Sequence, residues 1–121
     1  MAKHVLIIED EPNIIAAIGF ILSRDGWQVT AHSDGADAVK VVQHNLPQLL
    51  ILDVMLPNKS GFDILQDLRA DPQTASLPVL MLTARGQNKD RLLAEKLGVS
   101  RFMTKPFSNA EILTVVQELA G

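Results

Sequence analysis

A chain of 121 residues is long enough for one domain with a single hydrophobic core. Its net charge of −3 comes without a basic stripe of the kind that nucleic acids require, and it has no cysteine for a disulfide or a thiolate metal site. No apolar run approaches the roughly 20 residues that cross a membrane, and the N-terminus lacks a signal-peptide pattern. We therefore expect a single domain over residues 1–121, located in the cytoplasm, that contacts neither nucleic acid nor membrane directly.

Five short apolar runs alternate along the chain with five amphipathic segments. Short apolar runs bounded by turn residues are typical of strands buried in a parallel sheet, and the amphipathic segments are typical of the helices that connect them. The expected strands span 4–8, 27–31, 49–52, 79–82 and 101–104. The expected helices span about 12–25, 33–45, 61–70, 89–98 and 109–119. The second strand is the most polar, so we expect it at an edge of the sheet.

Local signals mark two of the helix starts. Ser33 is expected to cap the second helix, and Ser108 has capping-box spacing with Glu111 at the start of the last one. The fourth helix has a thin apolar stripe, and we expect it to be among the less firmly anchored elements. Its predicted inward positions are Leu92, Leu93 and Leu97.

Charged and hydroxyl side chains follow four of the predicted strands. Glu9 and Asp10 follow the first strand, Asp53 the third, Thr83 the fourth and Lys105 the fifth. Because parallel strands end at one edge, we expect these side chains to lie together where ligands bind in open α/β sheets. Two carboxylates about 4 Å apart repel each other by roughly 4 kcal/mol at an effective dielectric of 20, so the cluster predicts a compensating cation. An all-oxygen site without histidine or cysteine favours Mg²⁺.

Each of these residues has an ordinary explanation when it is taken alone. Asp53 could begin a turn or cap a helix, Thr83 could simply end a strand, and Lys105 could be a solvated lysine. Together, on four separate strands, coincidence is the weaker explanation.

Five short motifs occur in order along the chain. They are Ile-Ile-Glu-Asp-Glu at 7–11, Leu-Asp-Val-Met-Leu-Pro at 52–57, Gly61, Thr83-Ala84, and Lys-Pro-Phe at 105–107. Over nearly its full length the chain closely resembles the receiver domain of two-component response regulators. The resemblance implies a flavodoxin-like, doubly wound (βα)5 fold with a parallel sheet of order 2-1-3-4-5. It also implies that Asp53 accepts a phosphoryl group from a sensor histidine kinase or a histidine phosphotransfer protein.

The same resemblance implies roles for individual residues in a magnesium site. Asp10 and Asp53 would ligate Mg²⁺ through their carboxylates, and the backbone carbonyl of Met55 would be a further ligand. Glu9 would act through a metal-bound water. The domain would catalyse only its own phosphorylation and dephosphorylation, so it would not be an enzyme acting on other substrates.

The resemblance further implies how the phosphoryl group is held. Thr83 would hydrogen-bond it, Lys105 would pair with it, and backbone N–H groups near Met55 and Ala84 would complete the cradle. The Lys105–Pro106 peptide bond is expected to be cis. Phe102 matches the aromatic position that is coupled to Thr83 in the family, although simple core packing explains it equally well.

Three alternatives remain open. A haloacid-dehalogenase-type phosphatase also uses a strand-end aspartate with Mg²⁺, but it requires a second acid where this chain has Met55. A flavodoxin-type flavin binder would need a phosphate cradle in the first loop, where residues 9–11 are acidic. A receiver-like module could also bind partners without being phosphorylated.

Output is expected through the face formed by the fourth helix, the fifth strand and the fifth helix, either to a downstream protein or to a fused output domain. Ser100 and Arg101 stand just before Phe102, where dimerising receivers carry acidic residues, and the last helix has no basic residue. We therefore expect a monomer or a weak dimer. Met55 and Arg85 are expected to flank the path of the hydrolytic water and so to set the lifetime of the phosphorylated state.

Overall fold

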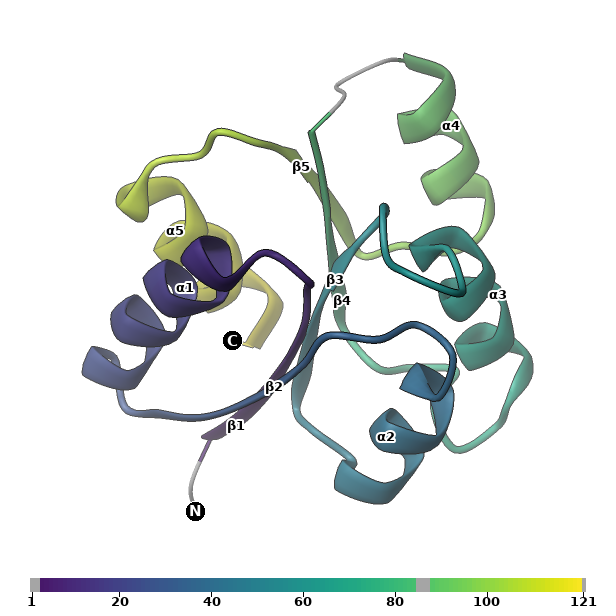
Figure 1. Ribbon diagram of the computed structural model, residues 1–121, viewed down its shortest axis with the longest axis horizontal. Coiled ribbons are helices and arrows are strands. Elements are labelled where there is room, and N and C mark those ends of the chain that lie inside the picture. The colour runs from purple at the N-terminus through teal and green to yellow at the C-terminus, as the bar shows by residue number, and fades with distance from the viewer. Residues whose placement is uncertain (1–2, 85–87, 121) are drawn as a thin grey trace.

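The computed structural model describes residues 3–84 and 88–120. Its strands are β1 (Lys3–Ile8), β2 (Trp27–His32), β3 (Leu49–Asp53), β4 (Val79–Thr83) and β5 (Arg101–Thr104). Its helices are α1 (Pro12–Arg24), α2 (Ala38–Asn45), α3 (Gly61–Ala70), α4 (Asn88–Lys96) and α5 (Asn109–Ala120). The five strands pair in parallel in the order β2-β1-β3-β4-β5 (Figure 1). The predicted flavodoxin-like (βα)5 fold and its strand order are confirmed.

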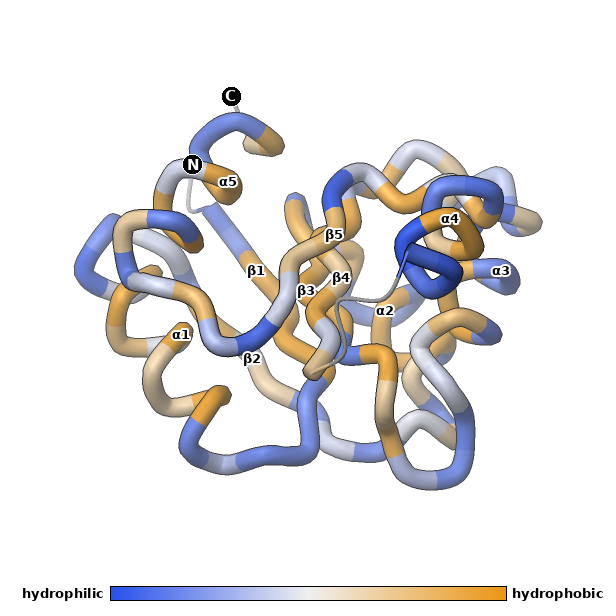
Figure 2. The backbone as a smooth tube through the Cα atoms, turned by 90° about the horizontal axis from the view of Figure 1, so that it is seen from above, coloured by the Kyte–Doolittle hydropathy of each residue, from blue (hydrophilic) through white to orange (hydrophobic). Residues whose placement is uncertain are grey.

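The sheet is covered by helices on both faces, so its central strands are buried on both sides. Helices α1 and α5 cover one face, and α2, α3 and α4 cover the other (Figure 1). Along β3, Leu49 and Ile51 pack into the first core, whereas Leu50 and Leu52 pack into the second. This alternation explains why β3 is apolar at every position before Asp53. The hydrophobic segments gather in the central strands when the backbone is coloured by hydropathy (Figure 2).

The N-cap of the second helix lies four residues later than expected. Residues 33–37 form a loop, and Asp37 rather than Ser33 is the N-cap residue of α2. Gly35 holds this loop against the β3–α3 loop, since its N–H donates to the carbonyl of Pro57. A Cβ at Gly35 would lie 2.9 Å from that carbonyl oxygen, so only glycine allows this approach. The expected cap at Ser33 was wrong because a contact distant in sequence fixes the backbone there.

The inward face of α4 also differs from the prediction. Ala94 is the buried residue of this helix, whereas Leu92 is 63% exposed and Leu93 is 40% exposed. Leu97, beyond the end of the helix, packs partly against the second core. A small residue faces the sheet at this point, so α4 buries little apolar surface. That agrees with the expected weak anchoring of this helix.

The start of α5 follows the expected capping box. The backbone N–H of Glu111 donates to Ser108 Oγ at 3.1 Å, and the backbone N–H of Ser108 donates to Glu111 Oε1 at 3.0 Å. These two reciprocal bonds satisfy N–H groups that the helix itself leaves without acceptors.

Arg69 on α3 ties three segments together at the other end of the sheet. Its Nε donates to the carbonyl of Gly98, and its Nη1 donates to carbonyls of the α3–β4 loop, including that of Leu77 at 2.8 Å. Burial lowers the pKa of this guanidinium.

Among the described helices, no segment is long and apolar enough to span a bilayer.

Candidate functional site: an acidic cluster with one lysine

The carboxyl ends of four strands meet at one edge of the sheet. Strand β1 ends at Ile8 beside Leu52 of β3, Asp53 is paired with Leu82 of β4, and Thr83 is paired with Thr104 of β5. Backbone hydrogen bonds extend this pairing past the strand ends, from Glu9 N–H to the His32 carbonyl and from Lys105 N–H to the Thr83 carbonyl. The side chains of residues 9, 53, 83 and 105 are thereby brought to the same place.

Three carboxylates form the acidic part of the site. Glu9 is completely buried, Asp53 is 2% exposed, and Asp10 is exposed. One oxygen from each lies within 4.8 Å of the others, a separation that a single cation can bridge. Glu9 Oε2 accepts hydrogen bonds from the backbone N–H groups of Asp10 and Glu11, which fixes its orientation.

Lys105 supplies the positive charge beside these carboxylates. Its Nζ lies 2.8 Å from Glu9 Oε1 and 3.4 Å from Asp53 Oδ1. Burial by itself lowers the pKa of Lys105, but the hydrogen bond to Glu9 and the charges of Asp53, Glu9 and Glu11 outweigh it and hold the pKa above its usual value. Lys105 is therefore a fixed cation at physiological pH.

Burial perturbs the carboxyl group of Glu9. Burial is the main cause and raises its pKa from 4.5 to about 7. The hydrogen bond to Lys105 opposes this rise, whereas the neighbouring Asp53 adds to it. Without a bound cation, the buried cluster thus accommodates the charge of Glu9 poorly.

A glycine allows the β3–α3 loop to pass close behind Asp53. The N–H of Gly61 donates to the carbonyl of Val54 at 2.8 Å. A Cβ at Gly61 would clash with the backbone carbonyl of Asp53 and would lie 3.0 Å from the Cα of Val54. The packing of α3 against the end of β3 therefore depends on the absence of a side chain at this position.

The other predicted site residues differ in burial. Thr83 is buried at the end of β4, Ala84 is exposed directly after it, and the side chain of Met55 is largely exposed. The Lys105–Pro106 peptide bond is cis. Arg85 lies outside the described residues.

Phe102 on β5 is half-buried against the core that α2, α3 and α4 cover. The guanidinium of Arg91 on α4 lies 5.7 Å from the centre of its ring, a distance at which a cation and an aromatic face attract each other. Sequence reasoning did not find this contact, because α4 and β5 are brought together only by the fold.

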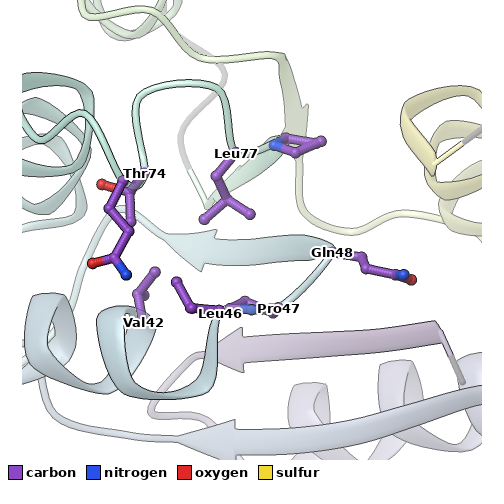
Figure 3. A pocket seen from close by; sticks show the side chains of 8 residues that line it. Val42, Leu46, Pro47, Gln48, Thr74 and Leu77 are labelled. Carbon is purple, nitrogen blue, oxygen red and sulfur yellow. The ribbon is translucent and has the colours of Figure 1, made fainter.

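A hollow lies at the end of the sheet opposite the acidic cluster, where β3 and β4 begin. It has a volume of about 330 Å³ (Figure 3). Its lining residues are Val42, Leu46, Pro47, Gln48, Gln73, Thr74, Leu77 and Pro78, none of which is charged. We therefore place the chemistry at the acidic edge and not in this uncharged hollow.

The family model of the response regulator receiver domain matches residues 5–117, nearly the whole chain. The chain belongs to this family. Receiver domains are the phosphorylated modules of two-component systems, and as a class they are not conventional enzymes. They bind Mg²⁺ at an acidic pocket and interact with histidine kinases and output domains. The cluster of Glu9, Asp10 and Asp53 is an acidic group that could hold such an ion.

Curated relatives of this receiver domain include two transcriptional regulators. It is 39% identical to the alkaline phosphatase synthesis transcriptional regulatory protein PhoP of Bacillus subtilis, over 93% of this chain and 46% of the relative. It is 36% identical to the phosphate regulon transcriptional regulatory protein PhoB of Escherichia coli, over 97% of this chain and 51% of the relative. The chain thus spans about half the length of the curated relatives it matches.

Solved structures give the same fold. The receiver domain of the Pseudomonas aeruginosa sensor histidine kinase PA1611, with a magnesium ion coordinated in its active site cleft, matches with a TM-score of 0.90 and 27% identity, over 100% of this chain and 99% of that one. The BeF3-activated N-terminal receiver domain of Klebsiella pneumoniae RstA matches with a TM-score of 0.89 and 26% identity, over 97% of each chain.

Proposed function

We propose that residues 1–121 form a single receiver domain in which Asp53 takes a phosphoryl group from a sensor histidine kinase or a histidine phosphotransfer protein. One observation carries this proposal: Lys105 Nζ lies 3.4 Å from a buried Asp53 oxygen, at the edge that also holds Glu9 and Asp10. A carboxylate in this position can attack phosphorus, and the ammonium beside it offsets negative charge as that charge develops. The domain would catalyse only its own phosphorylation and dephosphorylation.

The residues present suit Mg²⁺ as the cofactor. Glu9 Oε1 and Asp53 Oδ1 are buried, and one ammonium, Lys105 Nζ, lies 2.8 and 3.4 Å from them. One positive charge does not balance the three carboxylates of Glu9, Asp10 and Asp53. We assign the carboxylates of Asp10 and Asp53 and the backbone carbonyl of Met55 as ligands, with Glu9 acting through a bound water. When bound, Mg²⁺ supplies positive charge that offsets the carboxylates and the incoming phosphoryl oxygens.

The phosphoryl group would be held by a hydroxyl, an ammonium and backbone amides. We assign hydrogen bonding to the hydroxyl of Thr83, ion pairing to Lys105, and the remaining contacts to backbone N–H groups of Met55 and Ala84. The placement of Thr83 at the end of β4, one strand from Asp53, supports this assignment.

We propose that the signal leaves through the face of α4, β5 and α5, by a coupled change at Thr83 and Phe102 that favours one of two pre-existing arrangements. A hollow of about 490 Å³ on this face includes Phe102 in its lining. On the same face Arg101 pairs with Glu118 at 3.2 Å, so charges that a second copy could use are already paired within the chain. This supports a monomer or weak dimer that contacts a downstream protein or a fused output domain in the cytoplasm, without direct contact to nucleic acid.

The alternatives find less support. Met55 cannot donate a proton to a leaving group, which counts against a phosphatase of the haloacid-dehalogenase type. A receiver-like module that is never phosphorylated would have no need of four charged residues converging on one buried edge.

Incubation with acetyl phosphate and Mg²⁺ tests the proposal. We expect an acid-labile label on the wild-type domain, no label on Asp53→Asn, and an unchanged label on Asp63→Asn, which alters an exposed aspartate in the first turn of α3. Chelation of Mg²⁺ should also abolish labelling. Label that persists on Asp53→Asn would show that another residue is the acceptor.

A further inference from the structure

Glu11 lies between the acidic cluster and α1, and its carboxylate is directed toward Lys105. It is the N-cap residue of α1, yet its side chain accepts no hydrogen bond from the helix. Instead, Lys105 Nζ donates a hydrogen bond to Glu11 Oε1 at 3.4 Å, although the two residues are 94 positions apart. The Glu11 side chain is 57% exposed, so this carboxylate faces solvent on one side and the site on the other.

The side chain of Glu11 contacts the site through Lys105, whereas its backbone N–H donates to Glu9 Oε2. The oxygens that could share a cation belong to Glu9, Asp10 and Asp53, and Glu11 is outside this group. Lys105 thus interacts with two carboxylates of the cluster and with a third that lies apart from it. An ammonium has three N–H donors, so three carboxylates can occupy all of them.

We propose that Glu11 is a positioning residue that holds the Lys105 ammonium on the α1 side of the site and thereby slows phosphorylation of Asp53. This inference rests on the proposed function. During transfer, an Asp53 carboxylate oxygen forms a bond to phosphorus while the bond from phosphorus to the donor atom breaks, and the donor leaves with that electron pair. The donor atom is the imidazole nitrogen of a phosphohistidine or the acyl oxygen of acetyl phosphate. Lys105 keeps its protons and must turn a donor toward the phosphoryl oxygens. Glu11 competes for that donor until Lys105 releases it.

The expected size of the effect follows from the exposure of the pair. An ion pair with one partner open to water shifts an equilibrium by about fivefold at most. We therefore expect Glu11→Gln to raise the rate of labelling by acetyl phosphate, and the affinity for beryllofluoride with Mg²⁺, by about two- to fivefold. The matched control is Glu95→Gln, which removes the same charge from an exposed position on α4 and should leave both quantities unchanged.

A double-mutant cycle separates an action through Lys105 from a structural or general charge effect. In a Lys105→Met background, Glu11→Gln should no longer change the affinity for beryllofluoride. Glu11→Asp, which keeps the charge but is one methylene shorter, should behave like Glu11→Gln if reach to Lys105 matters. Glu11→Asp also replaces Glu11→Gln as the test variant if Glu11→Gln folds poorly.

Three results would overturn the inference. Equal rates for wild type, Glu11→Gln and Glu95→Gln would show that the carboxylate does not restrain Lys105. An effect of Glu11→Gln that persists with Lys105→Met would assign it to direct repulsion, and an equal effect of Glu95→Gln would assign it to net charge. Absence of any label on the wild-type domain would instead contradict the proposed function, so the two failures are distinguishable.

Discussion

Two glycine-to-alanine substitutions should have opposite effects on stability. At Gly61 a methyl group would clash with the backbone carbonyl of Asp53 and would lie 3.0 Å from the Cα of Val54. Carbon atoms in ordinary contact are about 3.5–4.0 Å apart, and the obstructing atoms belong to the backbone, which cannot rotate aside. At Gly19, inside α1, the nearest atom to the added methyl would be Val29 Cγ1 at 3.7 Å.

The magnitudes follow from these distances. Overpacking of this kind costs about 1–3 kcal/mol, so the free energy of unfolding of Gly61→Ala should fall by that amount. Gly19→Ala meets no clash and gains the helix propensity of alanine, so its free energy of unfolding should rise by up to about 1 kcal/mol. Because the obstructed carbonyl belongs to Asp53, Gly61→Ala should also slow phosphorylation by at least about tenfold.

Urea unfolding followed by the fluorescence of Trp27 measures both effects. Trp27 is the only tryptophan and is buried in the core, so its emission reports on global unfolding. If the free energy of unfolding has the same slope against urea concentration in the variants and in wild type, the substitutions have not changed the compactness of the native or unfolded state. The reasoning is refuted if Gly61→Ala is as stable as wild type, or if Gly19→Ala is destabilised to the same extent.

Two further predictions concern the site, and a third concerns the face of α4, β5 and α5. Glu9 has a folded-state pKa of about 7 against 4.5 in the unfolded chain. Without metal, the free energy of unfolding should therefore fall by on the order of 3 kcal/mol as the pH rises from 4.5 to 7, and then level off. Urea unfolding in the presence of a chelator should show this decline in wild type and not in Glu9→Gln. Met55→Asn and Arg85→Glu should speed phosphate release from the purified phosphoprotein, because the methionine is apolar and the arginine stays protonated, so neither can act as a base for water. If the lifetime of the phosphoprotein is unchanged in both variants, these side chains do not set it. Sedimentation with beryllofluoride and Mg²⁺ should show a monomer or weak dimer, and a tight dimer through the face of α4, β5 and α5 would contradict the proposed output.

Sequence alone determined the elements whose signals are local. The apolar run before Asp53 predicts a strand buried on both faces, and Ser108 with Glu111 predicts the start of α5. The structure bears out both. These signals work because they depend on burial along one strand or on hydrogen bonds within one turn. The sequence also predicted that Asp53, Thr83 and Lys105 meet at one edge of the sheet, because the ends of parallel strands lie at the same edge.

Tertiary structure decided what depends on contacts distant in sequence. The start of α2 is set by Gly35 against Pro57, and the inward face of α4 is set by the packing of Ala94 in the second core. The hydrogen bond between Glu11 and Lys105 joins opposite ends of the chain, and the raised pKa of Glu9 arises from burial. Periodicity indicates that a residue faces the core, but it carries no information about which distant atoms will stand opposite it. That information exists only once the chain has folded.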